Sequence, residues 1–392
     1  MQQMLLNAWQ KQAFWLWLLL PISWLYRLIT GLNKKLYQHG LKKMYYAPIP
    51  VIVIGNITVG GSGKTPLIIA LVQYLQQKKV NVGVISRGYG GDTKQMPTMV
   101  TVQSTPGVVG DEPCLIVQTT AVPMAVCPDR KQAIELLLQH YPNLQVILTD
   151  DGLQHYALDR DAEWIVVDAK RGFGNRQVLP TGFLREPVKR LLDPNATVIY
   201  HFAAAVKNQQ NFSNQPMMYL EQQPILPLFF TKPLFATDSL LSTESRLFDA
   251  KFDAKFDAKQ QTLSAQTVIA MTGIGFPDRF FNSLTQLGFD LVKKPLNDHH
   301  QFSLSDFENL PNLPIVITEK DAVKVRLLLQ NTLQKNTLQN NLNNGNTNQT
   351  CADLANKIWV LPVKAVLNAK VYQILDQQLN HLLGDFVADE VL

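Results

Sequence analysis

A glycine-rich loop between a predicted strand and a predicted helix constrains this chain more than any other feature. Residues 58–65 read Thr-Val-Gly-Gly-Ser-Gly-Lys-Thr and follow the apolar run Val-Ile-Val-Ile at 51–54. A helical stretch from Pro66 to Leu75 comes next. This order is typical of a P-loop, in which glycines let backbone N–H groups close around phosphate oxygens at a helix N-terminus. An ordinary glycine-rich turn is the alternative, but it accounts for neither the strand nor the Lys-Thr pair.

The P-loop interpretation gives each residue of this loop a place in a nucleotide site. The residues are Thr58, Val59, Gly60, Gly61, Ser62, Gly63, Lys64 and Thr65. We expect Lys64 to reach the β- and γ-phosphates of ATP, and the Thr65 hydroxyl to bind Mg²⁺. Thr58 stands where the general motif has its first glycine. Pro66 suits an early helical position, where its missing N–H costs little.

Further apolar runs continue the alternation of strands and helices. Additional strands are predicted at 82–86, 145–149, 163–167 and 197–200. This alternation predicts an α/β fold, a P-loop NTPase-like doubly wound parallel sheet. Later runs predict a second, smaller α/β domain, with strands at 267–272, 315–318 and 357–362.

Composition divides the chain into four predicted parts. They are an N-terminal membrane-interface helix with a basic linker at 1–45, the P-loop domain at 46–230, a low-complexity insertion or linker at 231–265 and a C-terminal α/β domain at 266–392. Phe-Asp-Ala-Lys occurs three times in tandem from residue 248, and an Asn-rich tract fills 331–350. Neither polar tract can bury a core, so both are expected to be surface insertions.

The N-terminal part predicts attachment to a membrane. Residues 12–26 are uncharged and rich in Trp, Leu and Phe, but a full span needs ~20 apolar residues. Pro21 is expected to interrupt a helix in its middle. Because Trp and Tyr prefer the membrane interface, we expect a helix that dips into one leaflet and is held by Arg27 and the following lysines. No acidic residue precedes Asp92; a solvated basic surface, a buried core helix, a signal peptide and a full span stay open as alternatives.

Two adjacent acids, Asp150 and Asp151, close the predicted strand at 145–149. Carboxylates at the carboxyl edge of the sheet, facing a P-loop, have the layout of a Walker B motif. We therefore expect both acids, together with Thr65, to bind the metal ion. Solvated loop residues are the alternative.

Gly110-Asp111-Glu112-Pro113 precedes an apolar run and supports two interpretations. Asp111 is a good helix N-cap, and Pro113 suits a first helical turn. A catalytic base is compatible with this placement, because a helix N-terminus also holds a carboxylate ionised. The residues alone leave both open.

The remaining polar clusters are weaker signals. Asp298-His299-His300 contains the only adjacent histidines, and no cysteine completes a metal site, since the three cysteines are scattered. Such scatter also fits a reducing compartment. Arg185-Glu186-Pro187 lies in a basic stretch, residues 170–190, that could hold phosphate or form a solvated face.

Taken together, these segments resemble the tetraacyldisaccharide 4'-kinase family of lipid A biosynthesis. The matches run in the family's order through residues 55–66, Ser-Arg-Gly-Tyr-Gly at 86–90, Gly-Asp-Glu-Pro at 110–113, Asp-Asp-Gly-Leu-Gln-His at 150–155, Leu-Arg-Glu-Pro at 184–187, Asp-His-His at 298–300 and Thr-Glu-Lys-Asp at 318–321. Thr58 fits the P-loop of this family. The two polar tracts are not family features, and they leave the motifs intact.

The resemblance implies that the γ-phosphate of ATP passes to the 4'-hydroxyl of an acylated glucosamine disaccharide 1-phosphate lipid. It implies Mg²⁺, two α/β domains, and an N-terminal helix at the cytoplasmic face of the inner membrane, in contact with its lipids. The implied catalytic residues are Asp111, His299, Lys64, Asp151 and Arg185. The implied substrate contacts are Arg87, Tyr89, Gln154, His155, Arg185 and Glu186. Neither nucleic acid nor a protein partner is implied.

Two other functions stay open from the residues. A membrane-associated P-loop ATPase or nucleotide switch acting on another partner would share the loop. It would hydrolyse nucleotide and form no phosphorylated lipid. A membrane scaffold with a vestigial P-loop would bind no ATP, but the intact Lys64, Thr65 and Asp151 argue against it.

Overall fold

The structure is a computed structural model of the whole chain. It describes residues 13–202, 215–229, 266–339 and 345–384, together with positions 8, 9, 11 and 263. The chain forms two compact units, Met1–Glu221 with Val363–Leu392, and Gln222–Pro362. The Phe-Asp-Ala-Lys repeats lie outside the described residues.

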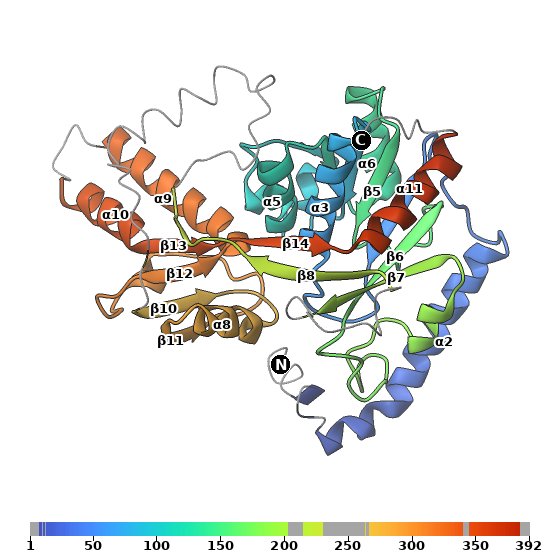
Figure 1. Cartoon of the computed structure of the whole chain (residues 1–392), viewed down its shortest axis with the longest axis horizontal. Helices are drawn as coiled ribbons and strands as arrows, with labels where there is room; N and C mark the ends of the chain where they lie inside the picture. Colours follow the sequence, from blue (N-terminus) through green and yellow to red (C-terminus); the bar gives the residue numbers. More distant parts are fainter. Residues whose placement is uncertain are drawn as a thin grey trace. The chain divides into compact units, whose positions relative to one another are not determined.

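A nine-stranded sheet, counted over the described residues, is the framework of the first unit (Figure 1). Its order is β14-β8-β7-β6-β1-β5-β2-β4-β3. The strands are β1 Val51–Gly55, β2 Val82–Ser86, β3 Thr98–Val100, β4 Met124–Val126, β5 Val146–Asp150, β6 Ala162–Asp168, β7 Ala196–Phe202, β8 Met217–Gln222 and β14 Val363–Leu367. The pairs from β4 through β8 are parallel, and β3 runs antiparallel to β4. The predicted α/β fold with a parallel sheet is confirmed.

Strand β1 lies inside the sheet, between β5 and β6. All its residues are buried, which is why its sequence is a continuous β-branched run instead of an alternating one. From β1 the chain crosses to β2, returns to β5 and then places β6 on the other side of β1. Such a reversal opens a crevice at the carboxyl ends of the strands, and the P-loop begins there.

Five helices accompany this sheet among the described residues after the N-terminal helix. They are α3 Lys64–Gln77, α4 Pro106–Val109, α5 Asp111–Thr120, α6 Arg130–His140 and α11 Ala369–Leu383. Helix α3 buries one stripe of side chains against the unit: Leu67, Ile68, Leu71, Val72 and Leu75. It is tied to α11 by the Tyr74 hydroxyl, which donates to Asp376 Oδ2 over 2.7 Å.

The division into units differs from the predicted domains at the C-terminus. The sequence pattern assigned all of 266–392 to the second domain, whereas residues from Val363 onward belong to the first unit. The physical reason is pairing: β14 hydrogen-bonds to β8 at the edge of the larger sheet. Trp164 Nε1 on β6 also donates to Gln378 Oε1 of α11 over 2.8 Å.

The second unit has a smaller sheet of five described strands, in the order β11-β10-β12-β13-β9. They are β9 Leu226–Pro227, β10 Thr267–Thr272, β11 Asp290–Pro295, β12 Ile315–Thr318 and β13 Ile358–Leu361, accompanied by α8 Pro277–Gln286, α9 Glu319–Gln339 and α10 Gly345–Lys357. All pairs are parallel except β13 with β9. The described parts of the Asn-rich tract continue α9 and begin α10.

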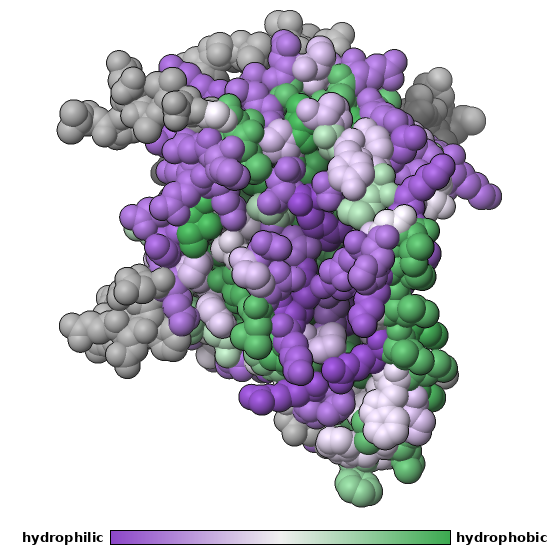
Figure 2. Space-filling model, turned by 90° about the vertical axis from the view of Figure 1, so that its right-hand side faces the viewer, coloured by the Kyte–Doolittle hydropathy of each residue, from purple (hydrophilic) through white to green (hydrophobic). Residues whose placement is uncertain are grey.

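The N-terminal segment forms a short 3-10 helix, η1 Phe14–Leu19, followed directly by helix α2 Leu20–Gln38. The expected interruption at Pro21 is wrong, because Pro21 occupies the first turn of α2, where no N–H bond is lost. Phe14–Gln38 is long and apolar enough to cross a membrane, a test that core helices and signal sequences also pass. Its exposed apolar side chains include Leu18, Trp24, Leu25, Leu28, Ile29 and Leu32. Figure 2 shows hydrophobic residues in a band along the right-hand edge of this side of the molecule.

Candidate nucleotide and phosphate site

The P-loop leaves β1 at its carboxyl end and turns into α3 through glycines with left-handed backbone. Gly60 and Gly63 both have φ of 95°, a conformation that costs other residues energy. A Cβ on Gly63 would lie 2.7 Å from Nδ1 of His201, so no side chain fits there. No side chain caps the start of α3. The first N–H groups of the helix are thus presented to an anion in the way that phosphate sites require.

Asn56 fixes the shape of the loop from directly behind it. Its buried side chain donates to Thr58 Oγ1 over 3.2 Å and to the Gly60 carbonyl over 3.3 Å. Its Oδ1 accepts from Lys64 Nζ over 3.1 Å. Thr58 therefore provides a hydroxyl where the general motif has glycine. Sequence reasoning gave Asn56 no role, although its position between the strand and the loop was a usable signal.

Asp151 lies at the centre of an ion triad. Its carboxylate is 3.1 Å from Lys64 Nζ and accepts from Arg185 Nη1 over 2.9 and 2.8 Å. Burial by itself would raise the pKa of Asp151, but the two cations outweigh it and hold that pKa below its usual range. Asp151 is thus ionised, and it links the P-loop to the predicted Leu-Arg-Glu-Pro segment.

Asp150 faces a different environment from its neighbour. Its Oδ2 accepts from Ser86 Oγ over 3.2 Å, whereas its buried Oδ1 has no hydrogen-bond partner among the described residues. Burial, followed by the negative charge of Glu112, raises the pKa of Asp150. Arg130 Nη2 donates to the Asp150 carbonyl over 3.2 Å and so fixes the end of β5. An unpartnered buried carboxylate oxygen is suited to a cation.

The oxygen atoms at the carboxyl edge of the sheet suit Mg²⁺ better than a metal ion that takes all its ligands from protein side chains. Among the described residues, no group of three or more His, Cys, Asp or Glu could hold a metal ion. Mg²⁺ commonly takes only one or two carboxylates and completes its shell with water and substrate phosphates. Asp150 and Thr65 are hard oxygen donors of this kind. The assignment of Asp151 to the metal stays a prediction, and its carboxylate already binds two cations.

Asp111 begins helix α5 on the neighbouring loop. Gly110 occupies the N-cap position with φ of 96° and without a side-chain cap. The buried Asp111 carboxylate accepts from the N–H of Glu112 over 3.0 Å. A Cβ on Gly110 would lie 2.6 Å from the carbonyl oxygen of Tyr89. The two loops are therefore in direct backbone contact, and the predicted residues at 87, 89 and 111 lie in one neighbourhood.

The other predicted substrate residues differ in accessibility. Arg87 and Tyr89 are exposed, the latter at 63% of its surface. Burial, together with the charges of Arg130 and Arg160, lowers the pKa of His155 to about 4. The His155 imidazole is consequently neutral near pH 7. Their roles toward a substrate stay predictions.

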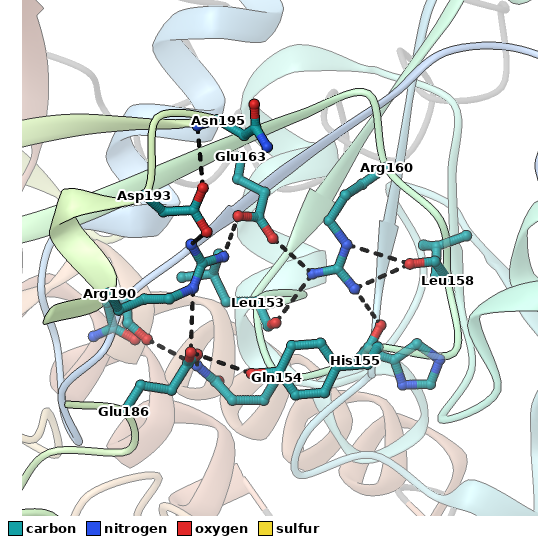
Figure 3. A network of polar contacts seen from close by, with 12 residues as sticks. Leu153, Gln154, His155, Leu158, Arg160, Glu163, Glu186, Arg190, Asp193 and Asn195 are labelled. Atoms are coloured by element: carbon teal, nitrogen blue, oxygen red, sulfur yellow. Dashed lines mark hydrogen bonds and ion pairs between the residues drawn. The ribbon is translucent and has the colours of Figure 1, made fainter. Parts of the chain in front are cut away.

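Gln154 and Glu186 belong to a buried polar network (Figure 3). Glu186 accepts from Gln154 Nε2 over 2.6 Å and from the Tyr156 hydroxyl over 3.2 Å, and it pairs with Arg190. Arg190 also pairs with Glu163 and is nearly fully buried. Glu186 thus serves to hold the loop after Asp151 against the segment that carries Arg185. Its predicted contact with substrate stays untested.

Arg160 completes the same network on the other side (Figure 3). It donates to the carbonyls of Leu153 over 3.0 Å and His155 over 2.6 Å, and to Glu163 over 3.1 Å. Arg160 thereby holds the loop that follows β5 through the carbonyl oxygens of that loop. Because Arg190 is buried within the network, the basic stretch is not simply a solvated face.

The predicted histidines lie in the second unit. His300 Nε2 is 3.1 Å from Asp306 Oδ2, so it is engaged inside that unit. His299 has φ of 58°, and its Nε2 is 3.9 Å from Asp298 Oδ1. Its N–H donates to the carbonyl of Gly273 over 3.0 Å. Asp111 belongs to the other unit, and a pairing of Asp111 with His299 stays a prediction.

The fold and the site define a P-loop phosphotransferase. Its P-loop lysine and Arg185 both pair with Asp151, which follows the end of strand β5. The sequence profile of the family described as tetraacyldisaccharide-1-P 4'-kinase matches residues 15–380. The chain belongs to the tetraacyldisaccharide 4'-kinase family. The resemblance inferred from the motifs is confirmed.

Individual relatives agree with this assignment, and each is named tetraacyldisaccharide 4'-kinase. The protein of Psychrobacter arcticus is 51% identical over 96% of this chain and 94% of its own length. That of Pseudomonas fluorescens is 38% identical over 98% of both. A solved structure of LpxK from Aquifex aeolicus in complex with ATP has the same fold, with a TM-score of 0.62 at 24% identity over 93% of this chain and 98% of that one.

The network in Figure 3 predicts a large stability cost for one arginine. Arg190→Ala would leave the buried carboxylate of Glu186 without its cation and that of Glu163 with Arg160 alone. We expect the free energy of unfolding to fall by about 3–5 kcal/mol, as for other broken buried pairs. Urea unfolding followed by circular dichroism measures it.

Lys131→Ala is the matched control. Lys131 pairs with Glu135 over 3.7 Å, and both side chains are half exposed. Its loss should cost at most about 1 kcal/mol. Equal costs for Arg190→Ala and Lys131→Ala would contradict the structural role of the network.

Proposed function

We propose that this chain transfers the γ-phosphate of ATP to the 4'-hydroxyl of a tetraacylated, 1-phosphorylated glucosamine disaccharide, which forms lipid IVA in lipid A biosynthesis. The ion triad of Lys64, Asp151 and Arg185 beside a P-loop carries the proposal. Membership of a kinase family that is named for this acceptor supports the choice of substrate.

The nucleotide would bind with its phosphates at the start of α3. Phosphoryl transfer needs mostly positioning and neutralisation of charge on the γ-phosphoryl group. Lys64 is held by Asn56 and Asp151 and is therefore preorganised. Arg185 pairs with Asp151 through Nη1, and the other N–H groups of its guanidinium could reach the transferred phosphoryl group. Both cations are thus fixed before the nucleotide arrives.

Asp150 and Thr65 are the residues we assign to Mg²⁺. The unpartnered, buried Oδ1 of Asp150 supports this assignment. When bound, the ion would neutralise charge on the phosphate oxygens. Asp151 would act mainly through the two cations that it holds.

Proton removal from the sugar hydroxyl is assigned to Asp111. Lys64 and Arg185 are cations, so they cannot accept the proton. The Asp111 carboxylate is buried at the start of a helix, where the helix dipole favours its ionised form. His299 is the proposed second member of the proton-accepting pair, on the basis of the family motif alone.

Attachment to the cytoplasmic face of the inner membrane is the remaining part of the proposal. The apolar side chains of α2 are exposed, and Arg27, Lys34 and Lys35 lie along the same helix. Apolar burial combined with cations suits an anionic leaflet. The lipid acceptor would then be drawn from the same leaflet.

Loss of the P-loop cation provides the test of the transfer reaction. We expect Lys64→Ala to lower transfer about 10²–10³-fold, as when one preorganised donor is removed. The measurement is incorporation of label from γ-labelled ATP into a membrane lipid extract. Lys78→Ala, an exposed lysine just past the other end of α3, is the control and should be unaffected. Labelled inorganic phosphate without labelled lipid would instead favour the ATPase or switch.

The proton acceptor has its own test. Asp111→Asn keeps the size of the side chain, and we expect kcat to fall ~10²–10⁴-fold because general-base help is lost. ATP affinity should change little. If His299 acts with Asp111, the double variant should be little worse than either single one. A stable and fully active Asp111→Asn enzyme would end the proposal of a catalytic base.

The membrane face can be altered without touching the site. Replacing Leu25, Leu28 and Leu32 by Gln removes exposed apolar surface, so binding to anionic vesicles should be lost. The KM for lipid should rise more than the KM for ATP. Leu287→Gln, an exposed leucine of the second unit, is the control. Undiminished vesicle binding by the triple variant would contradict attachment through α2, and an N-terminal tag reachable only from the periplasm would show a full span instead.

A further inference from the structure

A segment of the first unit, residues 171–186, lies between the P-loop and helix α2, and we call it the bracket. On one side it contacts the P-loop backbone. Val59 N–H donates to the Phe183 carbonyl over 2.8 Å, and Arg185 N–H donates to the Ile57 carbonyl over 2.7 Å. Arg171 Nη1 donates to the Val59 carbonyl over 2.5 Å. The bracket therefore hydrogen-bonds to the P-loop backbone at Ile57 and at both the N–H and the carbonyl of Val59.

The other side of the bracket is bound by polar groups of α2. Ser23 Oγ is 2.8 Å from Thr181 Oγ1 and accepts from the Thr181 N–H over 3.0 Å. The Tyr26 hydroxyl donates to the carbonyl of Arg185 over 3.0 Å. Ahead of the helix, Trp9 Nε1 donates to the Pro180 carbonyl over 2.9 Å. These bonds join chain segments more than 150 residues apart.

The placement of Ser23 is unusual for a helix that only anchors. It is the one buried residue of α2, at 1% exposure, whereas the apolar side chains around it are exposed. A helix kept for lipid contact alone would not need a hydroxyl here, because burying a polar group costs energy unless it is bonded. Thr181 on the bracket is also fully buried. The Ser23 hydroxyl therefore finds its partners on the bracket, at Thr181 Oγ1 and at the Val178 carbonyl, which is 3.1 Å away.

We propose that α2 positions the phosphate site, with Ser23 and Tyr26 as positioning residues. Ser23 fixes the bracket at Thr181, and Tyr26 fixes the backbone of Arg185. Arg185 in turn holds Asp151, which holds Lys64. The positions of Arg185, Asp151 and Lys64 thus depend on the hydrogen bonds between α2 and the bracket. This inference rests on the proposed function only for the identity of the phosphate acceptor.

An anchor without a positioning role predicts different behaviour. Loss of the Tyr26 or Ser23 hydroxyl would then leave both nucleotide affinity and turnover unchanged when the lipid is dispersed in detergent. Tyr26→Phe and Ser23→Ala remove one hydroxyl each and leave the exposed apolar face intact. Their effects therefore separate positioning from membrane binding.

The test uses the full chain in detergent, with a fluorescent ATP analogue as the probe. We expect Tyr26→Phe to weaken analogue affinity and to lower kcat/KM for ATP about tenfold, the equivalent of ~1.4 kcal/mol for one lost hydrogen bond. Ser23→Ala should weaken both at least as much, because the Ser23 hydroxyl makes more than one contact with the bracket. Binding to anionic vesicles should be unchanged. Thr30→Val is the control, since within the described part of the chain the Thr30 hydroxyl bonds to carbonyls of its own helix.

A double-mutant cycle guards against a general loss of folding. Thr181→Val removes the hydroxyl partner of Ser23 from the bracket and keeps the Thr181 N–H that also bonds to Ser23. The Ser23→Ala, Thr181→Val double variant should be little weaker in analogue affinity than Ser23→Ala alone, because Ser23→Ala already removes the contact that Thr181→Val removes. Additive losses would overturn the proposal, and so would Tyr26→Phe and Ser23→Ala proteins that bind the analogue as wild type does. Since analogue affinity needs no lipid acceptor, a wild type that failed to phosphorylate lipid would reject the proposed function without affecting this comparison.

Discussion

The carboxylate of Asp151 is the point on which the site depends. It holds Lys64 from the P-loop and Arg185 from the bracket, so three distant stretches of sequence share one charge centre. The sheet makes this possible, because β5 lies beside β1 and both end at the same edge. Remove this carboxylate and two cations are left close together with no counter-charge, which would push the P-loop and the bracket apart.

The surroundings of Asp151 are built to keep it in place. Behind it, the Glu163–Arg190–Glu186 network and Arg160 fix the loop that follows β5. Beside it, α2 fixes the backbone of Arg185 through Tyr26. Three successive polar contacts, through Arg185 and Asp151, thus connect Tyr26 of a helix with an exposed apolar face to Lys64 of the P-loop. Membrane attachment and nucleotide binding are, in this account, parts of one assembly.

The sequence predicted the parts of this site that depend on local pattern. The P-loop, the acid pair at the end of β5 and the parallel sheet were readable because strand, loop and helix follow one another within 30 residues or so. The role of Ser23 was not, since its partner Thr181 lies far along the chain and a serine in an apolar run resembles any other. The burial of Arg190 was not either, because a cation inside a basic stretch resembles its solvated neighbours. The pairing of β14 with β8 in the larger sheet was missed because the whole second unit separates the two strands in sequence, so no local pattern indicates that they pair. Pro21 was misjudged because the helix starts later than its apolar run.

The most direct test of the account is the fate of the γ-phosphate. The full chain is incubated with γ-labelled ATP, Mg²⁺ and a purified tetraacylated disaccharide 1-phosphate, and the extracted lipid is analysed by ³¹P NMR. The account predicts a second phosphomonoester at the 4' position of the sugar that lacked one, formed in equal amount to ADP. ADP and free phosphate without phosphorylated lipid, or phosphate at any other hydroxyl, would contradict it.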